Sequence, residues 1–356
     1  PNSPQFAIAY YGILKTGGTF TPLSPLLSPR EAKHQLNDSE AGILISLDLL
    51  YPGIAEIIPE TGVKHVITTS IADCYNPVIQ PLKPLEKIPV PDTLDLAEML
   101  KSNEPNAPEV SIDVKTDLAH LAYTGGTTGL SKGVMLSHYN VVVNVCQYSN
   151  WFSGGQIEMQ DGLPTTVYPP GVDPARDRLT TKDQETALVV VPWFHAMGTV
   201  GYLNNMIWSG NTMVVFPRFE PQEYLNAVKK YNATVLGGAP QLFIPLVSLP
   251  NFKDIDLSSV KLVSSGAAPL ALPVLDKMLN AFSGTVCEAY GMTECTMGAT
   301  ANPPDRNMIR QGSVGVPVFD TECKVVDLIS GEDLGPEEKG EICIKGPQVM
   351  QGYWNK

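Results

Sequence analysis

Short apolar runs rich in β-branched residues alternate with helical patterns along most of this chain, and that alternation limits the folds it can adopt. Buried strands are predicted at residues 19–23, 41–46, 63–68, 187–191, 212–216, 233–236 and 260–264. Helices are predicted at residues 5–14, 140–151, 201–208 and 221–231, and another from Ser28-Pro29-Arg30-Glu31, which has a capping serine and a proline at the first helical position. Strands that alternate with helices in this way form parallel sheets covered on both faces, so the predicted fold class is α/β.

The chain has 356 residues, which exceeds the usual size of one domain. Two α/β lobes, each doubly wound with helices on both faces of its sheet, are therefore expected. The predicted division is a first lobe at 1–151, an inserted polar loop at 152–186, a second lobe at 187–310 and a β-rich piece at 311–356.

The charge balance limits the kinds of partner that the protein can bind. With 37 acidic and 24 basic residues, the net charge is −13, which argues against a nucleic-acid partner, since such a partner requires a basic face. Any anionic ligand must be held by local groups. The six cysteines are scattered without a metal-binding spacing and are predicted to be reduced thiols.

Residues 186–217 are almost free of charge, yet prolines, glycines and asparagines interrupt them. A transmembrane segment is therefore not expected, because one needs about 20 predominantly apolar residues. The predicted location is the cytoplasm, with peripheral attachment to a membrane left open.

The run Thr124-Gly125-Gly126-Thr127-Thr128-Gly129-Leu130-Ser131-Lys132-Gly133 combines four glycines, four hydroxyls and one lysine. Glycines let backbone N–H groups approach an anion, hydroxyls donate to phosphate oxygens, and Lys132 adds a positive charge. A phosphate-binding loop is predicted here, with a flexible surface linker as the alternative. The spacing is not that of P-loop NTPases, because Lys132 is followed by glycine rather than Ser or Thr.

Four further blocks each follow an apolar run, where ligands bind in open α/β sheets. They are Pro192–Gly198 with His195, Gly237–Pro240, Ser264–Leu270, and Glu288–Glu294 with Tyr290. Taken singly, each block also has an interpretation without a functional role. In the order given, these are a buried histidine, tight backbone packing, a strand-to-helix turn, and a core aromatic with a solvated acid. Their combination favours a binding site.

These blocks, in this order, make the sequence resemble the adenylate-forming enzymes: acyl-CoA synthetases, beetle luciferases and the adenylation domains of peptide synthetases. The resemblance extends from Asn2-Ser3-Pro4-Gln5 to Gly340–Pro347 and Gln351–Trp354. It is greatest for synthetases of medium- or long-chain fatty acids. It also implies that residues 311–356 begin a small β-barrel subdomain.

The resemblance implies roles in ATP binding and catalysis. Lys132, His195, Thr293 and Glu294 would be catalytic, with Lys132 the cation of the phosphate loop, Thr293 at the α-phosphate and Glu294 on Mg²⁺. Thr128 would be a second metal ligand. The residues that would contact ATP are Thr124, Gly125, Gly126, Thr127, Thr128, Gly129, Lys132, Gly266, Ala267, Ala268, Glu288, Ala289, Tyr290, Gly291 and Thr293. Tyr290 would stack on the adenine.

The implied acyl site holds His195 at its carboxylate end, with Trp193, Gly238 and Met297 as wall residues. The implied chemistry joins a carboxylic acid to ATP, giving acyl-AMP and pyrophosphate, and then transfers the acyl group to coenzyme A. ATP, Mg²⁺ and coenzyme A are thus the expected cofactor and co-substrates, and a homodimer is included among the expected assemblies.

The sequence departs from the family pattern at its ends. The family's ribose-binding aspartate, its hinge and its small mobile C-terminal domain would follow Lys356 and are absent here, and the first strand of the first lobe is also missing. A fragment of a longer enzyme is therefore expected. Three alternatives remain: an aryl-acid ligase, an amino-acid-activating domain, and a non-catalytic nucleotide- or acyl-binding module. No acidic residue that could pair with a substrate ammonium lies in Pro192–Gly198 or Gly237–Pro240, which weighs against amino acids.

Overall fold

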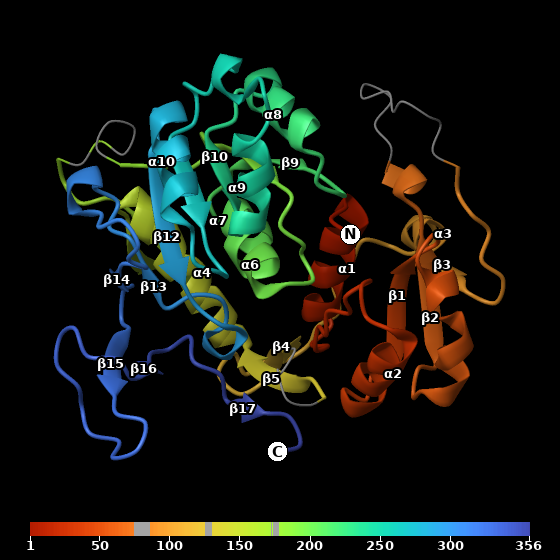
Figure 1. Ribbon diagram of the computed structural model, residues 1–356. Helices are drawn as coiled ribbons and strands as arrows, with labels where there is room; N and C mark the ends of the chain where they lie inside the picture. The colour runs from red at the N-terminus through yellow and green to blue at the C-terminus, as the bar shows by residue number, and fades with distance from the viewer. Residues whose placement is uncertain (75–85, 125–129, 172, 174–177) are drawn as a thin grey trace. The chain divides into compact units, whose positions relative to one another are not determined.

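The computed structural model describes residues 1–74, 86–124, 130–171, 173 and 178–356 (Figure 1). The chain divides into two compact units: unit 1 comprises residues 1–138 and 351–356, and unit 2 comprises residues 139–350. The sequence-based division placed its boundaries after residues 151, 186 and 310, and that finer division stays a prediction.

Unit 1 contains a parallel three-stranded sheet with the order β1-β2-β3. Its elements are α1 (Pro4–Lys15), α2 (Pro29–Asp38), β1 (Ile43–Leu47), η1 (Tyr51–Gly53), η2 (Ala55–Glu60), β2 (His65–Thr69), η3 (Ile71–Cys74), β3 (Leu94–Asp95) and α3 (Leu96–Ser102). The predicted start of α2 is confirmed, since the Ser28 hydroxyl accepts from the Glu31 N–H and the Glu31 carboxylate accepts from the Ser28 N–H.

A second sheet of unit 1 consists of β4 (Leu118–Thr124), β5 (Lys132–Ser137) and β17 (Gly352–Tyr353), in the order β17-β5-β4 and antiparallel. An aromatic cluster supports it: the Tyr10 hydroxyl lies 2.8 Å from His120 Nε2, and both rings pack edge-on against Phe20. The strand predicted at 19–23 was wrong except for Phe20, which forms a single bridge to His120.

Unit 2 is built on a seven-stranded sheet with the order β14-β13-β12-β11-β10-β8-β9. Its strands are β8 (Thr186–Val189), β9 (Thr212–Val215), β10 (Val235–Gly238), β11 (Leu262–Ser265), β12 (Thr285–Tyr290), β13 (Thr300–Ala301) and β14 (Val316–Pro317). The strands from β12 to β9 are parallel, whereas β13 pairs antiparallel with both of its neighbours, β12 and β14.

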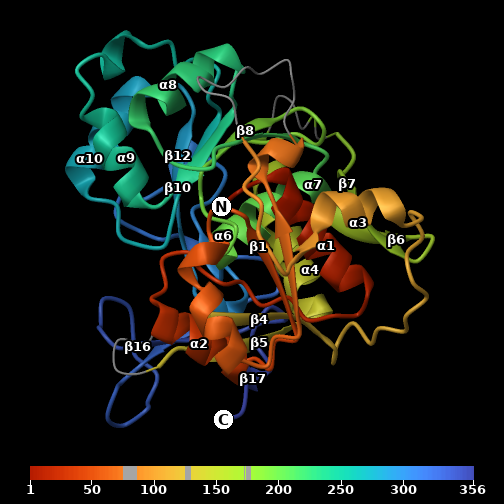
Figure 2. The ribbon, with the colours of Figure 1, turned by 90° about the vertical axis from the view of Figure 1, so that its right-hand side faces the viewer.

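Helices cover both faces of this sheet. The helices of unit 2 are α4 (His138–Ser153, which begins at the last residue of unit 1), α6 (Ala196–Gly198), the π-helical turn η4 (Thr199–Asn204), α7 (Asn205–Trp208), α8 (Pro221–Lys230), α9 (Pro240–Val247), η5 (Phe252–Asp254), α10 (Leu272–Ala281), η6 (Thr293–Cys295) and η7 (Arg306–Met308). Helices α8, α9 and α10 group on one face (Figure 2) and share a buried core with the strands, which includes Leu236, Phe243 and Met278. Tyr202 of η4 lies on the other face, over Gly237. The doubly wound arrangement is thus confirmed for unit 2.

The prediction of a loop was wrong for part of residues 152–186. Strands β6 (Gln156–Gln160) and β7 (Leu163–Val167) form an antiparallel hairpin there. Its turn residues Asp161 and Gly162 both have positive φ, 52° and 78°, which is the backbone that Asp-Gly pairs favour in two-residue hairpin turns.

Residues after Gly312 contain strands and no helix, as predicted. Strands β15 (Glu322–Val326) and β16 (Glu341–Lys345) pair antiparallel as a separate two-stranded sheet, so no closed barrel forms among the described residues. Among those residues, no helix combines the length and the apolar character that a membrane crossing requires.

Candidate active site

Most of the predicted site residues of unit 2 lie at one edge of its sheet, where the parallel strands end. The register aligns Gly238 with Ser265 and Ser265 with Glu288, so the last residues of β10 and β11 lie beside β12. His195 follows β8 in the chain, and Tyr290 ends β12. The carboxyl ends of parallel strands are the usual ligand site in such sheets.

The turn after β11 presents bare backbone. The Gly266 N–H donates to the Gly238 carbonyl at 3.1 Å, and Ala267 adopts a positive φ of 66°. A β-carbon on Gly266 would stand 3.5 Å from the Ala289 carbonyl oxygen and 3.7 Å from Met197 Cε, which are ordinary contacts. The packing of the described residues therefore does not require glycine at 266. A flat ligand lying against this backbone would require it, because a β-carbon would stand in its way.

The Glu288 carboxylate holds that same turn. Glu288 is buried, its Oε1 accepts from the Leu270 N–H at 3.3 Å, and its own N–H donates to Asn302 Oδ1 at 2.7 Å. These contacts give Glu288 a supporting position beneath residues 266–270.

The loop after β12 is fixed by hydrogen bonds to the backbone of residues 348–350. The Glu294 carbonyl accepts from the Met350 N–H at 2.9 Å, and the Thr296 hydroxyl donates to the Gln348 carbonyl at 2.7 Å. A β-carbon on Gly291 would overlap the Met297 carbonyl, so packing does require glycine there. Tyr290, Thr293 and Glu294 are half-buried at this edge.

His195 caps the short helix α6. Its Nδ1 accepts from the Met197 N–H at 3.3 Å, which leaves Nε2 as the nitrogen that carries the proton in the neutral ring. The residue keeps a solvent-exposed side, while burial of the rest of the ring lowers its pKa below 6.5. His195 is therefore a neutral hydrogen-bond donor at pH 7.

The predicted acyl-pocket residues differ in their surroundings. Trp193 is buried, with 2% of its surface exposed, and its carbonyl accepts from the Thr199 hydroxyl. Met297 is half-buried, and its Cε lies 3.6 Å from the β-carbon position of Gly201 on η4.

The structure adds two residues that the sequence did not single out for a role, Met197 and Tyr202. Met197 follows His195 closely and reaches toward Gly266, as described above. Its place in the Pro192–Gly198 block was the signal available for it. Tyr202 had no such signal, because its contact with Gly237 depends on how η4 packs on the sheet.

In unit 1, the predicted phosphate loop is the connection of the β4–β5 hairpin. Thr124 pairs with Lys132 at its base, and residues 125–129 lie outside the described residues, so the roles predicted for Gly125, Gly126, Thr127, Thr128 and Gly129 fall there. Lys132 is exposed and Gly133 is buried against the Leu121 and Tyr123 side chains.

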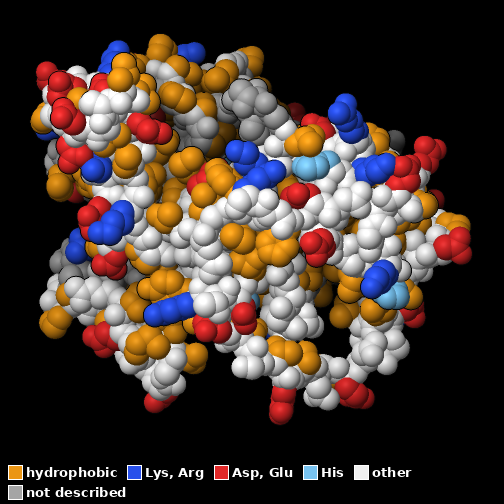
Figure 3. Space-filling model, turned by 90° about the horizontal axis from the view of Figure 1, so that it is seen from below, with side chains coloured by type: hydrophobic (Ala, Val, Ile, Leu, Met, Phe, Trp, Pro, Cys, Tyr) orange, Lys and Arg blue, Asp and Glu red, His pale blue; other side chains and the backbone are white. Residues whose placement is uncertain are grey.

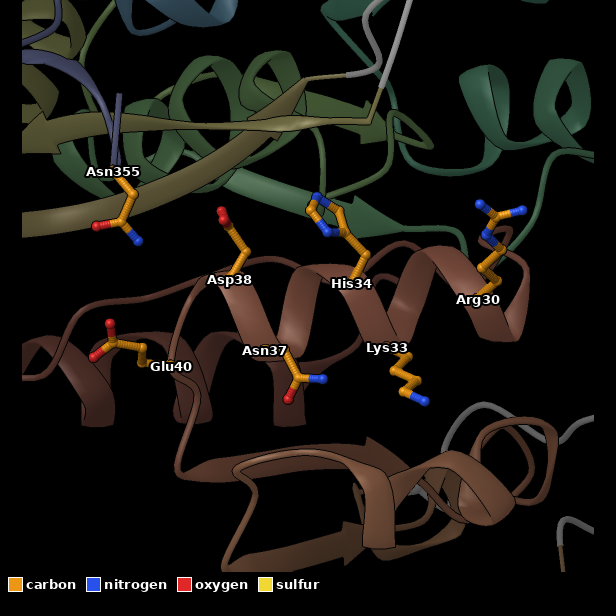
Figure 4. Close-up of a pocket in the computed structure, with 7 residues that line it drawn as sticks. All are labelled: Arg30, Lys33, His34, Asn37, Asp38, Glu40 and Asn355. Atoms are coloured by element: carbon orange, nitrogen blue, oxygen red, sulfur yellow. The ribbon is translucent and has the colours of Figure 1, made fainter.

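A polar pocket of about 620 Å³ lies along α2 in the same unit (Figure 4). It is lined by Arg30, Lys33, His34, Asn37, Asp38, Glu40 and Asn355. Arg30, His34 and Asp38 lie on one side of the helix and point toward the β4–β5 hairpin, and His34 Nε2 lies 3.2 Å from the Ser131 carbonyl.

On the face drawn in Figure 3, Lys and Arg side chains lie singly or in small groups among acidic and apolar ones.

Comparison with known proteins identifies a family match along nearly the whole chain. The family described as AMP-binding enzyme matches residues 1–354. The chain belongs to this family. It is 33% identical, over 367 residues, to a long-chain-fatty-acid–CoA ligase of Bacillus subtilis, with all of this chain and 60% of that protein covered. It is 30% identical to a probable 4-coumarate–CoA ligase of Dictyostelium discoideum, again covering all of this chain and 60% of that protein.

Among solved structures, this AMP-binding enzyme resembles a long-chain-fatty-acid–CoA ligase of Archaeoglobus fulgidus. The TM-score is 0.78 at 27% identity, covering all of this chain and 63% of that one. The chain therefore spans about three fifths of the length of the curated relatives it matches.

Proposed function

We propose that the protein activates a fatty acid with ATP and transfers the acyl group to coenzyme A. The observation that carries the proposal is the gathering of His195, Gly266 and Tyr290–Glu294 at the carboxyl edge of one parallel sheet, in a member of the AMP-binding enzyme family. The fatty-acid–CoA ligases among its relatives support the same reaction class.

In the first half-reaction, a carboxylate oxygen attacks the α-phosphorus of ATP. A mixed anhydride forms between the acyl group and the α-phosphate. The bond between the α-phosphorus and the oxygen that bridges it to the β-phosphate breaks, and pyrophosphate leaves. In the second, the thiol of coenzyme A attacks the acyl carbon, its proton is lost, and AMP leaves. The protein's task is to position the reactants and stabilise charge.

Different residues would bind the adenine and the phosphates of ATP. The bare backbone at Gly266–Ala268 suits an adenine ring, with Tyr290 available to stack on it. Thr293 would donate to the α-phosphate, and the loop of unit 1 with Lys132 would hold the β- and γ-phosphates. The neutral His195 Nε2–H would donate to the substrate carboxylate.

The residues fit a magnesium ion held partly by substrate. Among the described residues, no group of three or more His, Cys, Asp or Glu side chains could hold a metal by itself. Mg²⁺ in such enzymes takes one or two protein oxygens together with phosphate oxygens and water. The Glu294 carboxylate and the Thr128 hydroxyl are the proposed protein ligands, and the ion would neutralise charge as pyrophosphate leaves.

Carboxylate-dependent exchange of labelled pyrophosphate into ATP by the full-length protein tests the proposal. Exchange with medium- or long-chain fatty acids is expected, and Lys132→Ala and Glu294→Ala should each slow it. Absence of exchange across the whole acid panel would refute adenylation, and normal exchange in both variants would refute the site.

An aryl acid is the second candidate substrate, because two probable 4-coumarate–CoA ligases are among the relatives, at 30% and 31% identity. Including 4-coumarate and benzoate in the same panel separates the two. Higher kcat/KM for an aryl acid than for any fatty acid would favour this candidate.

A further inference from the structure

Contacts from two other segments hold the described ends of the phosphate loop. The Gly133 carbonyl accepts from the Trp354 N–H at 2.8 Å, and β17 pairs with β5 through Tyr353 and Val134. On the other side, the ring of His34 in α2 reaches the Ser131 carbonyl, with Nε2 3.2 Å from the oxygen. The backbone on both sides of Lys132 is thus fixed.

The Lys132 ammonium group lies over the ring of Tyr353, with Nζ 5.1 Å from the ring centroid. A cation at this distance over an aromatic face is attracted by the ring quadrupole. Lys132 is exposed and has a long flexible side chain, so this contact restricts where its charge can lie.

A hydrogen-bonded cluster fixes the segment that carries the ring. Trp354 Nε1–H donates to the Asp38 carbonyl at 2.9 Å, and the Tyr123 hydroxyl donates to Asp38 Oδ2 at 2.6 Å. Burial and the neighbouring carboxylate raise the pKa of Tyr123, so its hydroxyl stays a donor. Tyr123 itself pairs with Gly133, which closes the cluster around the base of the loop.

We propose that Tyr353 is a positioning residue for Lys132: its ring holds the ammonium group in place before ATP arrives, and Trp354 fixes that ring through Asp38. This inference rests on the proposed role of Lys132 in phosphate binding. Restricting the lysine in advance lowers the entropy lost when it meets a phosphate, so the benefit should appear in ATP affinity.

The test is a double-mutant cycle in the full-length protein, with binding of Mg-ATP measured by calorimetry and the KM for ATP measured by pyrophosphate exchange. Tyr353→Leu should weaken Mg-ATP binding by about two- to fivefold, with kcat changed much less. Tyr353→Phe, which keeps the ring, should restore wild-type binding. In a Lys132→Met background, Tyr353→Leu should have no further effect.

The chain offers a matched control in Lys230, whose Nζ lies 5.0 Å from the ring centroid of Tyr231 in unit 2. Tyr231→Leu removes a comparable contact and should leave Mg-ATP binding unchanged.

Two results separate the inference from the proposed function. If Lys132→Met weakens binding but Tyr353→Leu is without effect, or is equally harmful in both backgrounds, the positioning role is refuted and the proposed function stands. If Lys132→Met itself leaves binding and exchange unchanged, the assignment of Lys132 fails, and the positioning role fails with it.

Discussion

The hydroxyl of Tyr202 occupies the space where a β-carbon on Gly237 would stand. The strand β10 can pass beneath this buried phenol only with glycine at that position. The next residue, Gly238, points to the opposite face, toward Leu242 of α9. Two adjacent glycines thus let helices approach both faces of one strand.

Gly237→Ala should therefore destabilise the protein, because Tyr202 must move out of a packed site. The expected loss is about 1–3 kcal/mol in the free energy of unfolding, measured by urea denaturation. In a Tyr202→Ala background the same substitution should cost less, because the overlap with the ring is gone. Equal stability of Gly237→Ala and wild type would show that the ring does not pack as described.

Gly266→Ala should separate ligand binding from folding. A β-carbon at 266 meets only ordinary contacts and no left-handed φ, so the melting temperature should change little. If adenine lies on this backbone, ATP should bind about tenfold more weakly, which corresponds to about 1.4 kcal/mol.

Gly12→Ala is the control for that substitution, since Gly12 lies within α1 and its β-carbon would meet nothing within 4 Å. It should raise stability by about 0.5–1 kcal/mol and leave ATP affinity unchanged. Unchanged ATP affinity in Gly266→Ala would argue against adenine at this turn.

His195→Asn should separate helix capping from chemistry. Asparagine is a good N-cap and can still accept from the Met197 N–H, but it lacks the Nε2–H that is proposed to meet the substrate carboxylate. Stability should stay within about 0.5 kcal/mol of wild type, while kcat/KM for the acid falls by at least about tenfold. A variant with normal kcat/KM would exclude His195 from the reaction.

Acid should destabilise the protein partly through His120. Burial lowers the pKa of this histidine to about 3 from 6.5, so between these values the unfolded chain binds a proton that the folded protein does not. Its contribution to stability is present above about pH 6.5 and is lost as the pH falls toward 3, by up to about 1.4 kcal/mol per pH unit.

His120→Gln should flatten that dependence between pH 4.5 and 7, measured by urea denaturation at each pH. Burial also lowers the pKa values of His138 and His195, which leaves a smaller slope of the same sign in the variant. An identical slope in variant and wild type would mean that folding does not lower the pKa of His120.

Local signals in the sequence predicted the elements that carry their own start and stop residues. Ser28 and Glu31 cap α2 in the way that their spacing indicates. Helix α9 was not predicted, and α10 was implied only by the interpretation of residues 264–270 as a strand-to-helix turn. Each follows an alanine N-cap without a side-chain cap, and only the proline at the start marks them. The β6–β7 hairpin was missed although Asp161-Gly162 is a strong turn signal.

In the candidate site, too, the sequence predicted what depends on local signals and missed what depends on tertiary contacts. Strand ends are local features, so the sequence could place His195 and Gly266 in loops that follow strands and Tyr290 close to a strand end. The approach of Met197 to Gly266 joins segments that follow different strands, and the overlap of Tyr202 with Gly237 depends on how η4 packs. Such contacts arise from tertiary packing, and no spacing in one sequence reveals them.

The pairing of β17 with β5 has a consequence for the order of folding. More than half of the chain lies between these two strands, and all of unit 2 is encoded within that interval. During synthesis, unit 2 can form its core while β5 still presents an unpaired edge, because the residues that cover it have not yet been made. The sheet that carries Lys132 is thus completed late, by a contact of very long sequence separation, and such contacts are slow to form.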